Sequence, residues 1–203
     1  MSQASEAQRR EILRVLAGLR RAIEASVSLC APAEALAELA DRSERLAAAL
    51  ESSTGERPVP RYASRFDPAD PNAMIAYSPI TGWFNPLAPP VELRVEPGDP
   101  PHVVGSIAFG QAYEGPPASV HGSIVASVYD QLLALAAIAA GHGGPTATLT
   151  VHFRKMTPLH VGLRFDAWVD RVDGRKAFVR GTCHAGAELL SESEGLFVRF
   201  RGA

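Results

Sequence analysis

The sequence has only two cysteines, no marked excess of charge of either sign, and no uncharged run of about 18 apolar residues. Cys30 and Cys183 lie far apart in the chain, so we expect two free thiols in a reducing compartment rather than a disulfide framework. A formal net charge of -2 argues against a nucleic-acid partner, because such proteins need a basic surface. The N-terminus has no apolar export signal. We therefore expect a cytoplasmic protein with no membrane span and no nucleic-acid partner.

The first quarter of the chain has the pattern of two helices. Residues 5–29 place aliphatic side chains on one helical stripe and arginines mostly on the other side, which predicts an amphipathic helix. A second helix is expected from Pro32, in its first turn, to about Leu50. Its buried side chains are expected to be Leu36, Leu39, Leu46 and Leu50. We interpret the pair as a hairpin that packs on the main domain or on a partner subunit; a membrane-surface role for the arginines is the weaker alternative.

The remainder divides into a linker and one larger unit. Residues 52–72 are rich in Ser, Gly and Pro, which is typical of an extended linker, and further prolines keep the next stretch irregular. We therefore expect three parts: an N-terminal helical extension at 1–51, a linker and cover segment at 52–84, and the main domain at 85–203.

The main domain is predicted to contain strands around one unusual helix. Residues 124–140 are apolar nearly all round, and a helix without a polar face must be buried. Strands are expected at 91–95, 103–109, 146–154, 163–172, 176–184 and 189–200. The last four are expected to form a meander, with Asp173-Gly174 as one hairpin turn. An antiparallel sheet wrapped round one buried helix is an α+β architecture, the hotdog fold.

Asp130 is the only carboxylate on this central helix. A buried carboxylate is costly unless it is paired or hydrogen-bonded. Two interpretations stay open at this point. Asp130 is either a structural acid satisfied by Tyr129, Gln131 or a backbone group, or a general base or nucleophile at the floor of a cleft.

The start of the helix offers a complementary feature. N–H groups at a helix start have no internal partner and favour negative charge, and Gly122 lets a ligand approach the backbone closely. An oxyanion hole for a thioester carbonyl has these requirements. Gly122 and Asp130 are about 12 Å apart along one helix, too far to act on one carbonyl. Catalysis by both therefore predicts a dimer in which each site takes Gly122 from one chain and Asp130 from the other.

Three motifs carry a family resemblance. His121-Gly122-Ser123 is followed by Asp130, nine residues after the histidine. Thr146-Ala147-Thr148-Leu149-Thr150 begins the next strand, which continues as Val151-His152-Phe153-Arg154-Lys155-Met156-Thr157-Pro158-Leu159. With these motifs the chain resembles, over roughly residues 85–201, the PaaI-like hotdog thioesterases, a family that includes the THEM-type enzymes. Residues 85–90, 113–117 and 173–176 are similar to a bacterial subgroup with an N-terminal extension.

The resemblance implies hydrolysis of acyl-CoA thioesters to free acid and CoA by a homodimer or a dimer of dimers. It implies no cofactor beyond the CoA of the substrate. Asp130 then activates water or attacks the thioester, and Gly122 and Ser123 donate backbone N–H groups. His121 orients the loop, and Thr146 positions the water or the carboxylate.

The chain departs from the family pattern at two positions. Ser123 stands where the family has a second glycine, and Gly115 stands where many relatives have Asn. These departures favour the alternative hypothesis of a hotdog protein that binds acyl-CoA, in a regulatory role, with little turnover. A hydratase ranks third, because residues 132–140 offer no second acid–base residue.

Basic residues of the last strands are candidates for binding the phosphates of CoA. They are Arg154, Lys155, Arg175 and Lys176. The competing interpretation is that charges on strand edges merely prevent aggregation. The histidines show no ligand spacing with cysteines or acids, so we expect no metal site.

Overall fold

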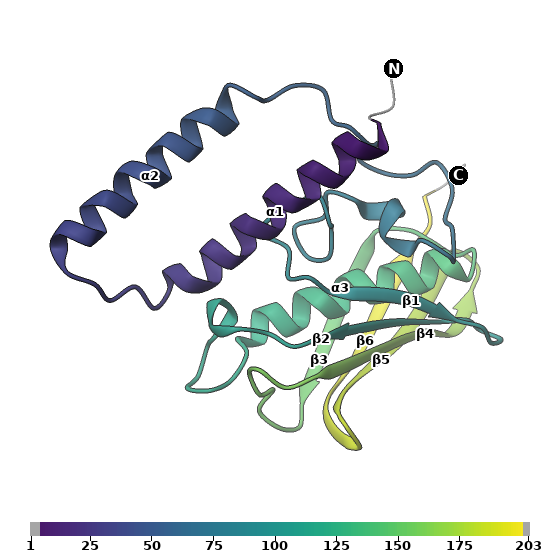
Figure 1. Cartoon of the computed structure of the whole chain (residues 1–203). Coiled ribbons are helices and arrows are strands. Elements are labelled where there is room, and N and C mark those ends of the chain that lie inside the picture. The colour runs from purple at the N-terminus through teal and green to yellow at the C-terminus, as the bar shows by residue number, and fades with distance from the viewer. Residues whose placement is uncertain (1–4, 201–203) are drawn as a thin grey trace.

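The computed structural model describes residues 5–200 and combines a curved six-stranded sheet with three α-helices (Figure 1). The helices are α1 (Glu6–Ser26), α2 (Ala33–Glu51) and α3 (Gly122–Ala139), with short 3-10 helices η1 (Pro71–Ile75) and η2 (Gln111–Tyr113). The strands are β1 (Glu92–Glu96), β2 (His102–Ile107), β3 (Thr146–Phe153), β4 (Leu163–Asp173), β5 (Lys176–Ala185) and β6 (Glu188–Val198). The strands and α3 lie within two residues of their predicted bounds.

All strand pairs are antiparallel, and the strand order is β1-β2-β4-β5-β6-β3. The predicted four-strand meander is therefore wrong: β4, β5 and β6 are consecutive neighbours, but β3 pairs with β6 at the far edge. The reason is the path of α3, which lies across one face of the sheet and carries the chain from β2 at one side to the other edge (Figure 1). The β4–β5 turn is also shifted by one residue. Asp173 pairs with Lys176, so Gly174 and Arg175 form the loop, with Gly174 at φ +55°.

The predicted architecture, an antiparallel sheet around one long helix, is confirmed. Leu132, Leu133 and Tyr129 of α3 are completely buried between the helix and β2, β4, β5 and β6. By length and composition α3 is apolar enough to cross a membrane, but a core helix meets the same criterion, and here α3 packs on the sheet.

Helix α1 lies against the body of the protein through two polar contacts. The Arg20 guanidinium donates to the carbonyls of Trp83 and Asn85, both at 2.9 Å, and to that of Ala88 at 3.1 Å. The Glu24 carboxylate accepts the backbone N–H groups of Gln111 and Ala112 at 2.6 and 3.0 Å. These side chains lie one turn apart, so they fix both the position and the rotation of α1.

Helix α2 is not packed as the sequence predicted. It has no buried residue, and Leu36, Leu39 and Leu46 are 37%, 45% and 47% exposed. Pro32 is the N-cap residue rather than part of the first turn. The leucine pattern predicted a helix correctly, but a helical period indicates only that one face is apolar and does not say what covers that face.

An ion-pair cluster joins strands β1 and β4 across the strand between them and makes stability depend on pH. Arg164 of β4 donates to Glu96 of β1 at 2.8 Å and to Asp166 at 2.6 Å. Hydrogen bonds from Arg164 and then Arg94 lower the pKa of Glu96 to about 2. A carboxylate with a folded-state pKa below its unfolded value stabilises the fold above the unfolded pKa, and this contribution disappears as pH falls through the folded pKa.

We predict that Glu96→Gln lowers the free energy of unfolding at pH 7 by at most about 1 kcal/mol, because the side chain is 41% exposed. The difference between wild type and variant should shrink as pH falls from about 4.5 to about 2. Urea unfolding of both proteins across this range measures it. A difference that stays constant with pH contradicts the prediction.

Candidate active site

The start of α3 is organised by a histidine cap. His121 is the N-cap residue, with extended backbone angles, and its Nδ1 accepts the Ser123 N–H at 3.1 Å. Ser123 Oγ lies 2.8 Å from the same nitrogen. The first helical N–H, that of Gly122, has no hydrogen-bond partner among residues 5–200. In this structure the Ser123 N–H is bonded to His121 and the Gly122 N–H is the available donor, so donation from Ser123 to a ligand stays a prediction.

The geometry also explains the glycine at position 115. A Cβ atom built on Gly115 would lie 2.7 Å from Cα of His121, closer than real Cβ contacts allow. The Gly115 N–H donates to the Ser119 carbonyl at 2.9 Å within the same turn. A residue with a Cβ atom, Asn included, does not fit this conformation of the loop, so Gly115 is tied to the local backbone path.

Asp130 lies on the face of α3 that the sheet leaves uncovered. The residues along this face are exposed or only partly buried, namely Ser123, Ser127, Asp130, Ala134 and Ile138. The expectation of a helix buried all round is therefore wrong for a single chain. One stripe of α3, with its only carboxylate in the middle, remains open for a ligand or a second subunit.

The carboxylate of Asp130 has one partner, and it comes from the edge strand. Thr146 Oγ1 donates to Asp130 Oδ1 at 2.7 Å. Neither Tyr129, Gln131 nor a backbone group bonds this acid; Gln131 instead interacts with Ser78 at 2.6 Å. The second oxygen of Asp130 has no hydrogen-bond partner within the described part of the chain. Asp130 is thus oriented by a hydroxyl and keeps one oxygen free to accept a proton.

The neighbouring Tyr129 fixes the rotation of α3. Its hydroxyl donates to the Ser191 carbonyl at 2.8 Å, and its ring meets Phe165 edge-on with ring centroids 5.3 Å apart. Burial raises the pKa of Tyr129 above its ordinary value. Because Tyr129 is held in the core, the next side chain along the helix must point about 100° away from it, toward β3.

Gly122 and Asp130, the two halves of the predicted site, lie beside opposite ends of β3. Gly122 faces the ring of Phe153 at the end of β3, since a Cβ there would lie 3.4 Å from it. Asp130 contacts Thr146 at the start of β3. Within one chain the structure therefore brings Asp130 and Thr146 together but does not bring Gly122 to them. Phe153 was missed by sequence reasoning, although an aromatic ending a strand next to the predicted oxyanion hole was a usable signal.

The chain is similar in sequence to two curated acyl-coenzyme A thioesterases. No protein-family model matches the chain. The chain is 32% identical over 94 residues to the acyl-coenzyme A thioesterase THEM4 of Xenopus laevis, covering 44% of this chain and 41% of that protein. It is 26% identical over 94 residues to the human acyl-coenzyme A thioesterase THEM5, covering 45% of this chain and 38% of that protein. The chain thus spans about two fifths of the length of the curated relatives it matches.

A solved structure matches nearly the whole chain. The crystal structure of a thioesterase superfamily protein has a TM-score of 0.80 and 29% identity, covering 92% of this chain and 94% of that one. This match and the similarity to acyl-coenzyme A thioesterases support a hotdog-fold thioesterase family for the chain. A match of this extent reaches beyond the hotdog domain into the N-terminal helices, because the residues after 84 make up less than two thirds of the sequence.

The basic residues predicted for CoA lie in two groups on the hotdog sheet. Arg154 and Lys155 follow β3 and pair with Glu192, at 2.8 Å, and with Glu188. Lys176 pairs in register with Val198, at the other end of β6, and the preceding Arg175 donates to the Arg199 carbonyl at 3.0 Å. The seven residue steps along β6 from Ser191 to Val198 separate the groups by about 23 Å. Within one chain they cannot hold the same phosphate.

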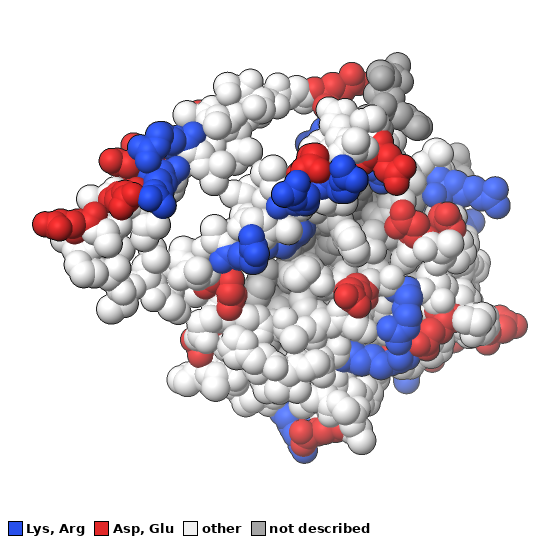
Figure 2. Space-filling view, viewed as in Figure 1, with Lys and Arg blue, Asp and Glu red and all other residues white. Residues whose placement is uncertain are grey.

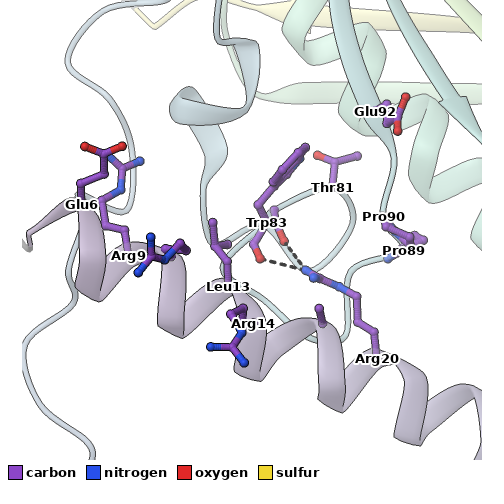
Figure 3. Close-up of a pocket in the computed structure, with 13 residues that line it drawn as sticks. Glu6, Arg9, Leu13, Arg14, Arg20, Thr81, Trp83, Pro89, Pro90 and Glu92 are labelled. Atoms are coloured by element: carbon purple, nitrogen blue, oxygen red, sulfur yellow. Dashed lines mark hydrogen bonds between the residues drawn. The ribbon is translucent and has the colours of Figure 1, made fainter.

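The described residues offer no metal site, and a large cavity that they line lies away from the predicted site. Among residues 5–200, no group of three or more His, Cys, Asp or Glu side chains is arranged to hold a metal ion. A cavity of about 950 Å³ lies between α1 and the segment 81–92, with Arg20 and Trp83 at its wall (Figure 3). None of the predicted site residues lines this cavity.

Proposed function

We propose that the protein hydrolyses acyl-CoA thioesters to a free acid and CoA, with Asp130 as the catalytic carboxylate. The observation that carries the proposal is the 2.7 Å hydrogen bond from Thr146 to Asp130, on the face of α3 that the sheet leaves uncovered. The substrate class is supported by the two curated relatives, both of which are acyl-coenzyme A thioesterases by name. The second carboxylate oxygen of Asp130 has no hydrogen-bond partner among the described residues, and the residue lies on a helix face that the sheet leaves uncovered.

The free carboxylate oxygen suits general-base catalysis. Asp130 removes a proton from water as the water oxygen attacks the thioester carbonyl carbon. The carbonyl oxygen becomes negative in the tetrahedral intermediate, and the Gly122 N–H stabilises it by donating a hydrogen bond at the positive end of α3. Collapse of the intermediate breaks the carbon–sulfur bond and releases CoA as a thiolate. The direct alternative, attack by the carboxylate itself, gives an anhydride that water then hydrolyses.

A two-fold dimer through β3 accounts for the separation of the two halves. β3 is an edge strand, and most of its residues are exposed in a single chain, which leaves a row of unpaired backbone groups. Antiparallel pairing of two such edges, with Leu149 opposite Thr150 of the partner subunit, sets Thr146 opposite Phe153 of the partner subunit. Because Phe153 packs beside Gly122, this pairing supplies the missing N–H to Asp130.

The same symmetry supports the assignment of the CoA-binding residues. Arg175 and Lys176 lie near the Thr146 end of the sheet, and Arg154 and Lys155 lie near the Phe153 end. The β3 pairing brings the first group of one subunit near the second group of the other. The four side chains then form a positive rim beside each active site, suited to the phosphates of CoA.

The test of the proposed function is release of free CoA by the wild-type protein from short, long and aromatic acyl-CoA substrates. Turnover of one class supports the enzyme and identifies its acyl group. One observation favours the alternative of a binding protein: His121 occupies the Ser123 N–H, so each site has a single backbone donor. Saturable binding of acyl-CoA without release of CoA would establish that alternative.

We predict that Thr146→Val lowers kcat about tenfold, because the variant keeps the shape of the side chain but loses the hydrogen bond to the carboxylate. Thr146→Ser keeps the hydroxyl and should retain most of the activity. Steady-state CoA release measures both. If the two variants are equally impaired, Thr146 acts through packing and not through its hydroxyl.

A further inference from the structure

Helix α2 carries an apolar stripe of which no residue is buried by the described part of the chain. Its leucines recur at heptad spacing, three and four residues apart, with Ser43 at one position of the series. The stripe consists of Leu36, Leu39, Ser43, Leu46 and Leu50. Three of these leucines are 37–47% exposed. The only side-chain ion pair of α2 within the described residues is internal, between Arg42 and Glu38.

Helix α1 has a second apolar stripe besides the face held on the body. Arg20 and Glu24 fix one side of α1, and Figure 3 shows Arg20 reaching across to the carbonyl of Trp83. The other stripe consists of Ile12, Val15, Leu19 and Ile23, spaced three and four residues apart. Val15 and Ile23 are 45% and 38% exposed. Helix α1 is therefore held in place on the body of the protein, and its second apolar stripe stays partly exposed to solvent.

The two stripes do not cover each other within one chain. Helix α2 runs beside α1 but stands away from it (Figure 1), and the space-filling view shows open space between them (Figure 2). The helices carry opposite net charge. Helix α1 has five arginines and three glutamates, a net charge of +2, whereas α2 has two arginines and five acids, a net charge of -3. Each helix is thus complementary to the other in both apolar pattern and charge.

We propose that α2 of a second copy of this chain packs along the α1 stripe, so that two copies exchange their N-terminal arms. The heptad stripe of α2 and the apolar stripe of α1, spaced three and four residues apart, suit side-by-side helix packing at about 8–10 Å between axes. A symmetric exchange buries all four stripes of two copies at once, which a single chain with its helices apart does not do. The arm contact is independent of the β3 edge and adds a second interface between subunits.

The test uses two full-length copies with different affinity tags, expressed together in a Cys30→Ser background. Cys183 is buried, so introduced cysteines are the only reactive thiols. One copy carries Val15→Cys and the other Ser43→Cys, near the middle of each helix, so the pair is close for either helix direction. A short bismaleimide should link the two tagged copies. The matched control, Asp41→Cys, lies about 200° round α2 from Ser43, and its crosslink should be at least about tenfold weaker.

Three results would overturn the proposal: equal crosslinking from positions 43 and 41, no crosslink between copies, or a crosslink only when both cysteines are in one chain. The last result means that α2 closes on its own α1. As a second measurement, Leu39→Glu with Leu46→Glu should weaken self-association by about tenfold or more in sedimentation equilibrium. These side chains are exposed, so the fold of a single chain is kept. An unchanged association constant also overturns the proposal, whether or not the protein is a thioesterase.

Discussion

Replacing Asp130 by Asn is expected to lower kcat for CoA release about a hundredfold or more, because the variant has no carboxylate to take a proton from water. The substitution keeps the size of the side chain, and the amide oxygen can still accept the hydrogen bond from Thr146. Substrate binding should therefore change little, and the loss should appear in kcat rather than in KM. Steady-state release of CoA from the best acyl-CoA substrate measures the effect.

The matched control for Asp130 is Asp170→Asn. Asp170 is an exposed acid of β4 that interacts with Arg180 at 3.5 Å, away from α3. Its loss removes the same charge from the protein and should leave kcat within about twofold of wild type, because surface ion pairs contribute little. Equal turnover by wild type and Asp130→Asn would mean that another group is the base. Equal loss in both variants would mean that total charge, not the position of the acid, determines the rate.

Replacing Gly122 by Pro is expected to lower kcat about 10²–10³-fold, the usual cost of one lost oxyanion donor. Proline removes the N–H but is well tolerated at the first position of a helix. The residue before it, His121, already has the extended backbone that precedes proline, with φ -61° and ψ 133°. Gly122→Ala keeps the N–H and places the same Cβ against Phe153, so it controls for the added side chain.

Mixing the two inactive variants tests whether each site is shared between subunits. A dimer of one Asp130→Asn chain and one Gly122→Pro chain has one site with both defects and one site with neither. Random association makes half of the dimers mixed, so co-expression should restore about a quarter of wild-type activity. If Gly122 and Asp130 of the same chain formed one site, every site would keep a defect and the mixture would stay inactive.

The sequence alone predicted where the helices and strands lie and which single residues have distinctive chemistry. A continuous apolar segment of helical length predicts α3, and apolar runs bounded by turn residues predict the strands. Asp130 is distinctive as the only acid in an apolar helix, and the motif from His121 to Thr146 carries the family resemblance. These features are local, and local patterns can be read without knowing how distant segments meet.

The tertiary structure decided which segments meet. Strand order is one example: β3 lies beside β6 because α3 crosses the sheet, and a list of strands carries no such information. The partner of Asp130 is another, since four acceptable partners were near in sequence or motif and only Thr146 lies within hydrogen-bond distance. Helix α2 is the third: its leucines predict a covered face, yet none of its residues is buried among residues 5–200. Burial depends on contacts between distant segments, and those contacts exist only in three dimensions.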